Sequence, residues 1–284
     1  MEEVIQVTAF VLLGDVRQRL ADLADDSIQT CITSPPYWGL RDYGNANQLG
    51  AEADPRDYIA TMVDVFREVR RVLRPDGALW LNLGDSYYNN FGGGSASMTT
   101  GNATAVRQKG RRNVPKHDTL KMKDLIGVPW EIALALRNDG WYLRQDIIWS
   151  KTNPIPESVT DRCTKAHEYL FLLTKSPRYF FDHNAIKEQA TSQDGQRNKR
   201  SVWSIPVRPF KDAHFAVMPE ALVEPCVLAT SRVGDTVLDP FMGAGTVGLV
   251  AIRHGRVFAG CEINEQYVDI ATKRLEPLTR LETR

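Results

Sequence analysis

The sequence predicts an α/β fold with a mostly parallel β-sheet covered by helices on both faces. Apolar segments of strand length alternate with segments whose apolar residues recur every three or four positions, and this alternation is typical of βαβ units. The chain has 284 residues, of which 43% are hydrophobic and 25% are charged. This length and composition predict one globular domain over residues 1–284, with a core that needs neither metal nor disulfides.

The first predicted strand covers residues 7–13, an apolar run that ends at Gly14 and Asp15. A short helix is expected over 16–23 and a second strand over 27–33. This strand–helix–strand order is the one that a parallel sheet requires, because a crossover must return the chain to the same edge of the sheet.

Residues 57–73 predict a helix, because their apolar residues fall at three- and four-residue steps. Pro75, Asp76 and Gly77 end this helix, and a strand is expected over 78–83. Further along the chain, helices are predicted over 125–137, 219–230, 246–254 and 266–275, and strands over 141–149, 169–174, 236–238 and 257–261.

Two polar segments interrupt this order, and we interpret them as inserts at about 86–122 and 184–212. Seven Lys or Arg against one Asp give residues 107–123 a charge of +6. Six Lys or Arg against two acids give residues 187–211 a charge of +4. The whole chain has a formal net charge of zero, so contact with a nucleic acid would be local. The alternative is that both inserts are solvated, disordered loops.

Four widely spaced cysteines form no C-x-x-C pair, namely Cys31, Cys163, Cys226 and Cys261. They predict reduced, mostly buried thiols rather than a zinc site or a disulfide framework. The first residues are acidic, and their apolar run is too short for a signal peptide or a membrane span. We therefore expect a soluble cytoplasmic protein with no membrane partner, and the five scattered histidines predict no metal site.

A glycine-rich turn joins a predicted strand to the helix that follows it. Gly243, Gly245 and Gly248 match G-x-G-x-x-G, and Glu262 ends the next strand, where an acid can bind the ribose hydroxyls of an adenosine ligand. This pattern fits a nicotinamide dinucleotide as well as S-adenosylmethionine. Asp239 at the strand tip favours S-adenosylmethionine, because a carboxylate suits its ammonium and sulfonium charges and repels a pyrophosphate.

The sequence Thr33-Ser34-Pro35-Pro36-Tyr37 follows another predicted strand. Ligands of such sheets bind beyond the carboxyl ends of the strands, so this tip can share a crevice with the glycine-rich turn. The two prolines offer carbonyl acceptors without N–H donors on a stiff backbone. Together with the Ser34 hydroxyl and an aromatic ring, they suit an amino group attached to a planar ring.

With these residues the chain resembles the β group of S-adenosylmethionine-dependent DNA amino-methyltransferases. Residues 33–43 (TSPPYWGLRDY) resemble motif IV of that family, which is catalytic, and residues 238–246 (LDPFMGAGT) resemble motif I, which binds the cofactor. The resemblance implies a Rossmann-like methyltransferase sheet, mostly parallel with an antiparallel strand, and a circularly permuted motif order. Weaker matches lie at 14–15, 79–85, 146–156, 167–168, 214–219 and Glu262.

The resemblance also implies S-adenosyl-L-methionine as the cofactor. Asp239 and the glycine-rich turn would lie at its methionine end, Glu262 at its ribose and Asp15 at its adenine edge. The predicted cofactor-binding residues are Asp15, Thr33, Phe215, Asp239, Phe241, Gly243, Gly245, Thr246 and Glu262.

The predicted catalytic residues are Ser34, Pro35, Pro36 and Tyr37. An exocyclic amino group is a poor nucleophile, because its lone pair is delocalised into the ring. If the Ser34 hydroxyl and the Pro35 carbonyl accept its two N–H bonds, the nitrogen can become pyramidal and attack the sulfonium methyl in line. The base must leave the duplex to reach this crevice, and Tyr37 is expected to stack on it.

The resemblance favours cytosine N4 as the methylated atom, since adenine-N6 enzymes of the family mostly carry Asp or Asn where Ser34 stands and cytosine-N4 enzymes mostly carry Ser. DNA adenine-N6 methylation is the alternative. An NAD-dependent oxidoreductase is a more distant one, and it leaves residues 34–37 without a role. Cys226 follows Pro225 within a predicted helix, and we interpret it as a core residue rather than as a cytosine-C5 nucleophile.

Double-stranded DNA is the expected partner, with a separately encoded restriction endonuclease and a homodimer as further expectations. We interpret 184–212 as the target-recognition insert and 86–122 as a clamp on DNA, because Lys and Arg neutralise phosphates and Arg, Asn or Gln read base edges. The predicted DNA-binding residues are Arg107, Lys109, Arg111, Arg112, Lys116, Arg197, Lys199 and Arg200.

Overall fold

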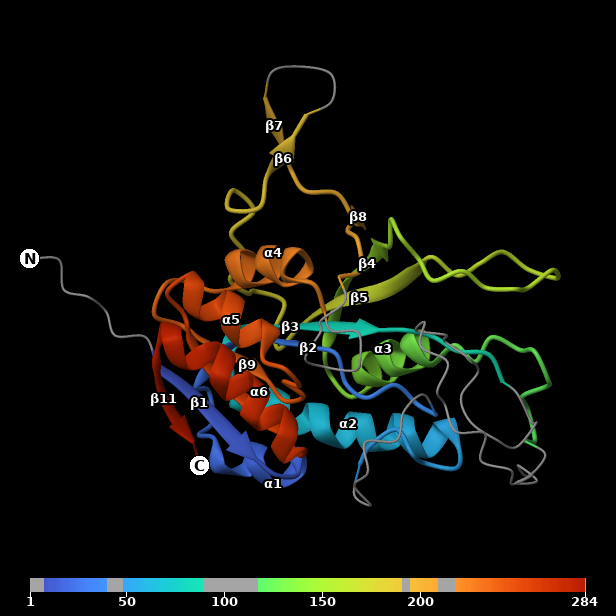
Figure 1. Ribbon diagram of the computed structural model, residues 1–284, viewed down its shortest axis with the longest axis horizontal. Coiled ribbons are helices and arrows are strands. Elements are labelled where there is room, and N and C mark those ends of the chain that lie inside the picture. Colours follow the sequence, from blue (N-terminus) through green and yellow to red (C-terminus); the bar gives the residue numbers. More distant parts are fainter. Residues whose placement is uncertain (1–7, 40–47, 89–116, 191–194, 209–217, 284) are drawn as a thin grey trace, which may run out of the picture.

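The computed structural model describes residues 8–39, 48–88, 117–190, 195–208 and 218–283, and a twisted sheet runs through its centre (Figure 1). The sheet has nine strands in the order β11-β1-β10-β9-β2-β3-β5-β4-β8. Its neighbouring strands are parallel except that β5 runs antiparallel to both β3 and β4. The predicted fold class, a mostly parallel sheet with an antiparallel strand, is confirmed.

The nine strands are β1 (Thr8–Leu13), β2 (Ile28–Thr33), β3 (Leu73–Leu83), β4 (Tyr142–Ser150), β5 (His167–Thr174), β8 (Val202–Ser204), β9 (Thr236–Asp239), β10 (Val257–Glu262) and β11 (Arg280–Thr283). A separate antiparallel ribbon consists of β6 (Glu188–Gln189) and β7 (Gln196–Arg197). The α-helices are α1 (Val16–Arg19), α2 (Pro55–Val72), α3 (Val128–Asn138), α4 (Glu220–Thr230), α5 (Thr246–Arg253) and α6 (Glu265–Leu275), and short 3-10 turns follow α1 and α6.

The helices form two layers, one on each face of the sheet. One apolar cluster joins α4, α5 and α6 to one face, and a second joins α1, α2 and α3 to the other. In Figure 1 α4 accordingly lies above β3, whereas α2 and α3 lie below it. Both faces of the sheet are therefore buried, as the alternation of strands and helices predicts.

Three of the four cysteines lie in this core, which confirms the prediction of mostly buried thiols. Cys31, Cys226 and Cys261 are buried, whereas Cys163 is exposed, and all four are free thiols. Burial raises the pKa of the Cys226 thiol well above its usual value, so Cys226 is a core residue of α4, as interpreted.

The structure corrects the sequence prediction at the start of β3 and in the second insert. β3 begins at Leu73, five residues before the predicted start, because Leu73 is buried opposite Ile28 and a register shift carries the pairing past the Pro-Asp-Gly turn. The segment 184–212 is also not wholly an irregular loop. It contains β6 and β7, which project from the body as a ribbon (Figure 1), and β8, which extends the main sheet.

The parallel pairing brings the carboxyl ends of β1, β10, β9, β2 and β3 to one edge of the sheet. β4 also ends at this edge and the antiparallel β5 begins there, since Ser150 pairs with His167. Within the described part of the chain, no helix is long and apolar enough to cross a membrane. The carboxyl edge is where ligands of α/β sheets bind, and it carries the residues described next.

Candidate active site

Asp239 and Thr33 meet at the middle of the carboxyl edge, where β9 and β2 are neighbours. The Thr33 hydroxyl donates a 2.7 Å hydrogen bond to the Asp239 carboxylate, and both residues are buried. The backbone N–H of Phe241 donates to the same carboxylate oxygen at 3.1 Å. The predicted catalytic strand tip and the predicted cofactor turn therefore adjoin.

The glycine-rich turn wraps around Glu262, the last residue of β10. One Glu262 oxygen accepts from the Gly243 N–H at 3.0 Å, and the other accepts from the Asn264 N–H at 2.9 Å. Gly243 and Gly245 have φ angles of 49° and 75°, which favour glycine. The turn and the ribose-binding acid predicted from the sequence thus form one hydrogen-bonded unit.

Two glycines of the motif allow close packing against neighbouring elements, and the cofactor contact expected of Gly245 stays a prediction. A Cβ atom on Gly245 would lie 3.0 Å from the Ala271 Cβ on α6, and one on Gly248 would lie 2.7 Å from the Phe258 ring. The Thr246 hydroxyl faces α6 as well, since the Arg274 guanidinium donates to it at 3.3 Å. Thr246 is therefore placed at the turn as predicted, but its hydroxyl already has a protein partner.

Two carboxyl groups lie close enough at this turn to affect each other, the buried Asp239 and the half-buried Glu262. Burial raises the pKa of Asp239 to about 7, and the negative charge of Glu262 adds to the effect of burial. Burial likewise raises the pKa of Glu262. In the part of the chain that the structure describes, Asp239 has hydroxyl and amide donors but no ion pair with Lys or Arg. Such a pair of acids suits a ligand that brings positive charge, and the ammonium and sulfonium groups of S-adenosylmethionine fit it.

Asp15 lies beyond the end of β1 at the same edge, as predicted. It caps α1 by accepting the Arg17 N–H at 2.9 Å, and the Arg17 guanidinium binds both of its oxygens. The hydrogen bond from Arg17 holds the pKa of Asp15 below its usual value. Oδ2 accepts only one of these three hydrogen bonds and can accept another, and a role of Asp15 toward the adenine edge stays a prediction. Phe215 lies outside the described residues.

The predicted catalytic segment leaves β2 beside the core of the α2 layer. The Pro36 carbonyl accepts a 2.7 Å hydrogen bond from the Tyr58 hydroxyl of α2, which fixes the prolines against that helix. The Tyr37 ring packs so closely on Gly84, after β3, that a Cβ atom there would lie 2.7 Å from the ring. Tyr37 is thus held in place by packing, and its stacking on a target base stays a prediction.

The Tyr37 hydroxyl belongs to a partly buried polar network at the start of β5. It donates to Glu168 Oε2 at 2.7 Å, and the Ser34 hydroxyl donates to the Tyr37 oxygen at 3.3 Å. Lys151, beyond the end of β4, forms a 2.5 Å ion pair with Glu168 Oε1. Burial alone would raise the pKa of Glu168, but the Lys151 ammonium and the hydrogen bonds from Lys151 and Tyr37 hold it below its usual value.

Sequence reasoning places residues 146–156 and 167–168 among the family's motifs but gives Lys151 and Glu168 no role, and it does not find Tyr58. The signal for the first two is a Lys that follows one strand and a Glu that begins the next. Only the antiparallel pairing of β4 with β5 brings them together. Tyr58 is one apolar-face residue of an amphipathic helix, so its hydroxyl contact leaves no signal in the sequence.

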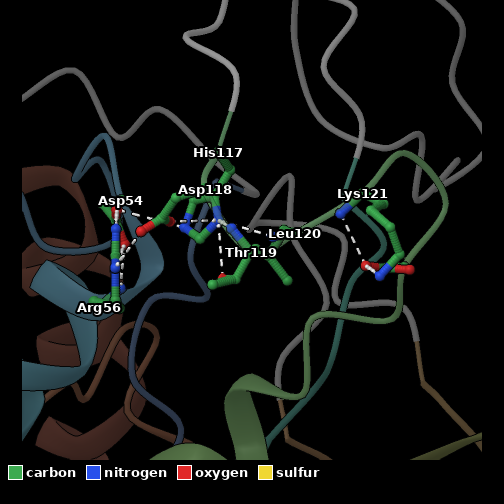
Figure 2. Close-up of polar contacts among 8 residues, drawn as sticks. Asp54, Arg56, His117, Asp118, Thr119, Leu120 and Lys121 are labelled. Carbon is green, nitrogen blue, oxygen red and sulfur yellow. Dashed lines mark hydrogen bonds and ion pairs between the residues drawn. The ribbon is translucent and has the colours of Figure 1, made fainter.

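The first basic insert emerges from the same edge. Backbone hydrogen bonds join Tyr88 to Lys123 and Asp124, at 2.9 Å and 2.8 Å, so residues 86–88 and 123–126 form a common stem. The ring centroid of His117 lies 5.9 Å from that of Tyr88 in this stem, and Figure 2 shows the polar contacts of His117. Its Nδ1 accepts the Leu120 N–H at 2.9 Å, and its Nε2 lies 3.4 Å from the Asp54 carboxylate that caps α2. Arg56 in turn binds Asp54 and Asp118. Arg107, Lys109, Arg111, Arg112 and Lys116 lie outside the described residues.

The second basic insert places its predicted residues on and after the β6–β7 ribbon. Arg197 pairs with Glu188 across the ribbon at 2.9 Å, and the Lys199 ammonium lies 4.8 Å from the centre of the buried Trp203 ring. Arg200 is 64% exposed and its guanidinium lies 4.0 Å from Glu188. Of these three residues, Arg200 is the one best placed to meet a phosphate.

The fold and the site together define a class of protein. Residues 28–273 match the model of the N6/N4 methyltransferase family, which is described as DNA methylase. The chain belongs to this family of S-adenosylmethionine-dependent DNA amino-methyltransferases.

The chain is similar over nearly its whole length to the type II methyltransferase M.SmaI of Serratia marcescens, with 49% identity over 93% of this chain and 90% of that protein. It is 48% identical to the type II methyltransferase M.Cfr9I of Citrobacter freundii, over 93% and 86% of the two chains.

The fold of this chain is similar to that of a DNA modification methylase of Thermus thermophilus, TTHA0409, solved in complex with S-adenosyl-L-methionine. That match has 25% identity, covers 97% and 99% of the two chains and has a TM-score of 0.65. The cytosine-N4-specific PvuII DNA methyltransferase shares the fold, with a TM-score of 0.70 at 18% identity over 95% and 88% of the two chains.

The cofactor of this chain is therefore S-adenosyl-L-methionine, and the nicotinamide dinucleotide that the glycine pattern alone allows is left without support. Within the site, Asp239, Glu262 and the N–H groups of the glycine-rich turn are the groups that could hold it. The described residues contain no cluster of His, Cys, Asp or Glu that could bind a metal ion.

Proposed function

We propose that this protein transfers the methyl group of S-adenosyl-L-methionine to the exocyclic N4 amino group of a cytosine that is flipped out of duplex DNA. The observation that carries the proposal is the 2.7 Å hydrogen bond between Thr33 and Asp239. It holds the segment that begins with Ser34 beside the carboxylate suited to the cationic cofactor. A methyl acceptor bound at Ser34 would thus be next to the methyl donor.

The site chemistry supports an acceptor that is an amino group. Ser34 Oγ and the Pro35 carbonyl would accept its two N–H bonds and free the lone pair of the nitrogen to attack the methyl carbon in line. Pro36 and Tyr37 would act through the rigidity of the segment and through stacking, respectively. Because Ser stands where the family's adenine enzymes mostly carry Asp or Asn, cytosine N4 is favoured over adenine N6.

The proposal extends to the partners of the enzyme. The names of M.SmaI and M.Cfr9I suggest that this chain is likewise the modification enzyme of a type II system, with a separately encoded endonuclease. We further propose a single catalytic domain with a clamp at 86–122 and a target-recognition insert at 184–212. A homodimer remains part of the proposal and is tested by light scattering of the purified protein.

One experiment separates the two bases. Mixed-sequence duplex DNA is incubated with the protein and S-adenosyl-L-methionine, digested to nucleosides and analysed by mass spectrometry. We expect N4-methylcytosine, and N6-methyladenine would overturn the assignment of the base. The matched control is Ser34→Ala, which should retain S-adenosyl-L-methionine binding but lose methyl transfer, because it removes an acceptor without touching Asp239.

A further inference from the structure

The buried pair of Lys151 and Glu168 needs an explanation beyond stability. Their side chains are only 14% and 9% exposed and lie 2.5 Å apart. A buried ion pair is often no more stabilising than apolar residues of similar size, because both charges lose their hydration. A pair of this kind at the carboxyl edge, linked to the predicted catalytic segment, is therefore a candidate for a role in the reaction.

The hydrogen bonds that connect this pair to Ser34 all point in one direction. The Ser34 hydroxyl donates to the Tyr37 oxygen at 3.3 Å, and the Tyr37 hydroxyl donates to Glu168 Oε2 at 2.7 Å. Each oxygen can therefore accept a proton on one side while it gives up its own on the other. The Ser34–Tyr37 contact is the longer one and must shorten during transfer, as contacts in unliganded sites often do when substrate binds.

We propose that Glu168 is the final acceptor of the proton that the target amino group loses, and that the proton reaches it through the hydroxyls of Ser34 and Tyr37. The inference rests on the proposed catalytic role of Ser34. It assigns Lys151 to holding the Glu168 carboxylate in its ionised form.

The lone pair of the amino nitrogen forms the new bond to the methyl carbon, and the electron pair of the broken carbon–sulfur bond stays on sulfur, which gives S-adenosylhomocysteine. The nitrogen is then cationic and gives one proton to Ser34 Oγ as the Ser34 proton moves to Tyr37 and the Tyr37 proton to Glu168. The products are a neutral methylamino base and a protonated Glu168, which later returns its proton to water.

The direction of transfer is favourable. A cationic nitrogen attached to an aromatic ring is a strong acid, because loss of the proton restores delocalisation of the lone pair into the ring. Even a carboxylate stabilised by Lys151 can therefore accept this proton. A positioned proton acceptor of this kind typically contributes about 10²–10⁴-fold to the rate.

Single-turnover methylation, with enzyme in excess over DNA, tests the proposal because it excludes product release. Glu168→Gln keeps the acceptor oxygen for Tyr37 but cannot take a proton at neutral pH. We expect it to lower the rate by about 10²-fold or more with little change in the dissociation constants for DNA and S-adenosyl-L-methionine. Tyr37→Phe should have a similar effect. The double variant should be no slower than the slower single variant, since both interrupt one chain.

Two further variants keep the test decisive. Because Glu168→Gln leaves Lys151 without its counter-charge, the neutral pair Glu168→Gln with Lys151→Met is made in parallel in case the single variant does not fold. The matched control is Glu220→Gln, which removes a carboxylate from the exposed pair with Arg253 and should keep the wild-type rate. We also expect a larger solvent deuterium isotope effect in Glu168→Gln, because proton loss to water then limits the rate.

The outcomes distinguish this proposal from the proposed function. If Glu168→Gln methylates DNA at the wild-type rate while Ser34→Ala does not, the relay is wrong and the role of Ser34 stands. Additive losses in the double variant, or losses explained by weaker binding of DNA or cofactor, would also overturn the relay. If Ser34→Ala is fully active, the proposed role of Ser34 itself is wrong.

Discussion

Thr33 and Asp239 end neighbouring strands, and the 2.7 Å hydrogen bond between their buried side chains joins the two halves of the site. Thr33 is the last residue of β2 and directly precedes Ser34, and Asp239 is the last residue of β9. A displacement reaction requires donor and acceptor to be aligned closely. A hydrogen bond between the two strand tips fixes their relative position before either substrate binds.

Replacing Thr33 by Val should therefore weaken cofactor binding. The variant keeps the shape of the side chain but removes one of the donors to the buried Asp239 carboxylate, a loss typically of about 1–3 kcal/mol. We expect the dissociation constant for S-adenosyl-L-methionine, measured by isothermal titration calorimetry, to rise by about tenfold. Thr33→Ser keeps the hydroxyl and should bind almost normally. Equal affinities of wild type and Thr33→Val would show that this bond does not support the cofactor site.

Asp239 should make the stability of the free protein depend on pH. Burial and Glu262 raise its pKa to about 7 in the folded chain, compared with about 3.9 in an unfolded chain. The contribution of Asp239 to the free energy of unfolding is therefore full below about pH 4. It is lost as the pH rises toward about 7, by about 1.4 kcal/mol per pH unit at most. Relative to Asp239→Asn, the free energy of unfolding of the wild type should fall by about 2 kcal/mol between about pH 5 and pH 7 and then level off. Denaturant titrations at several pH values measure this difference, and parallel curves for the two proteins would contradict it.

The same carboxyl group should link cofactor binding to proton release. A ligand that brings an ammonium or sulfonium charge close to Asp239 favours its ionised form and lowers its pKa. Below about pH 7, S-adenosyl-L-methionine must displace a proton from Asp239, so its affinity should increase with pH up to about 7 and then become constant. Calorimetry in buffers with different ionisation enthalpies counts the protons released. Asp239→Asn should release none at this site, and proton release that persists in this variant would point to another group.

The sequence allows the central sheet and both strand tips to be predicted, because their signals are local. Thr33 and Asp239 stand at the ends of apolar runs, and glycines follow Asp239 at the spacing of a phosphate- or ribose-binding turn. The edge strands β8 and β11 have three and four residues, too few for a hydrophobic period, and only their pairing with β4 and β1 defines them.

The Glu168 network illustrates what local patterns leave out. Glu168 and Lys151 are seventeen positions apart, and Tyr37, whose hydroxyl donates to Glu168, is 131 positions from it. Their contact depends on β5 running antiparallel between β3 and β4. No periodicity of the chain encodes that reversal, so the buried ion pair becomes visible only in three dimensions.

Gly84 should be required for the position of Tyr37. A Cβ atom at residue 84 would lie 2.7 Å from Tyr37 Cε2, so Gly84→Ala must displace the ring and, with it, the hydroxyl that binds Glu168. We expect single-turnover methylation to fall by at least about tenfold, as displaced catalytic groups commonly cause, with cofactor affinity nearly unchanged. Glu220→Gln, in the exposed pair with Arg253, again serves as the control and should keep the wild-type rate. A Gly84→Ala enzyme with the wild-type rate would show that the position of Tyr37 is not critical.

Arg200 should contribute to DNA affinity without reading the sequence. Its guanidinium is 64% exposed and lies 4.0 Å from Glu188, whereas Arg197 binds the same carboxylate at 2.9 Å across the ribbon. Arg200 can therefore reach a phosphate while Arg197 holds β6 to β7. Arg200→Ala should lower the affinity for specific and random duplexes by similar factors and reduce the slope of log K against log salt concentration by about 1. Fluorescence anisotropy at several salt concentrations measures both quantities.

Arg253→Ala is the control for this prediction. It removes the same charge from the α5–α4 surface, where Arg253 pairs with Glu220, and should leave the slope unchanged. If Arg200→Ala weakens only the specific duplex, Arg200 contacts a base edge, and the segment after the ribbon takes part in sequence readout through this residue.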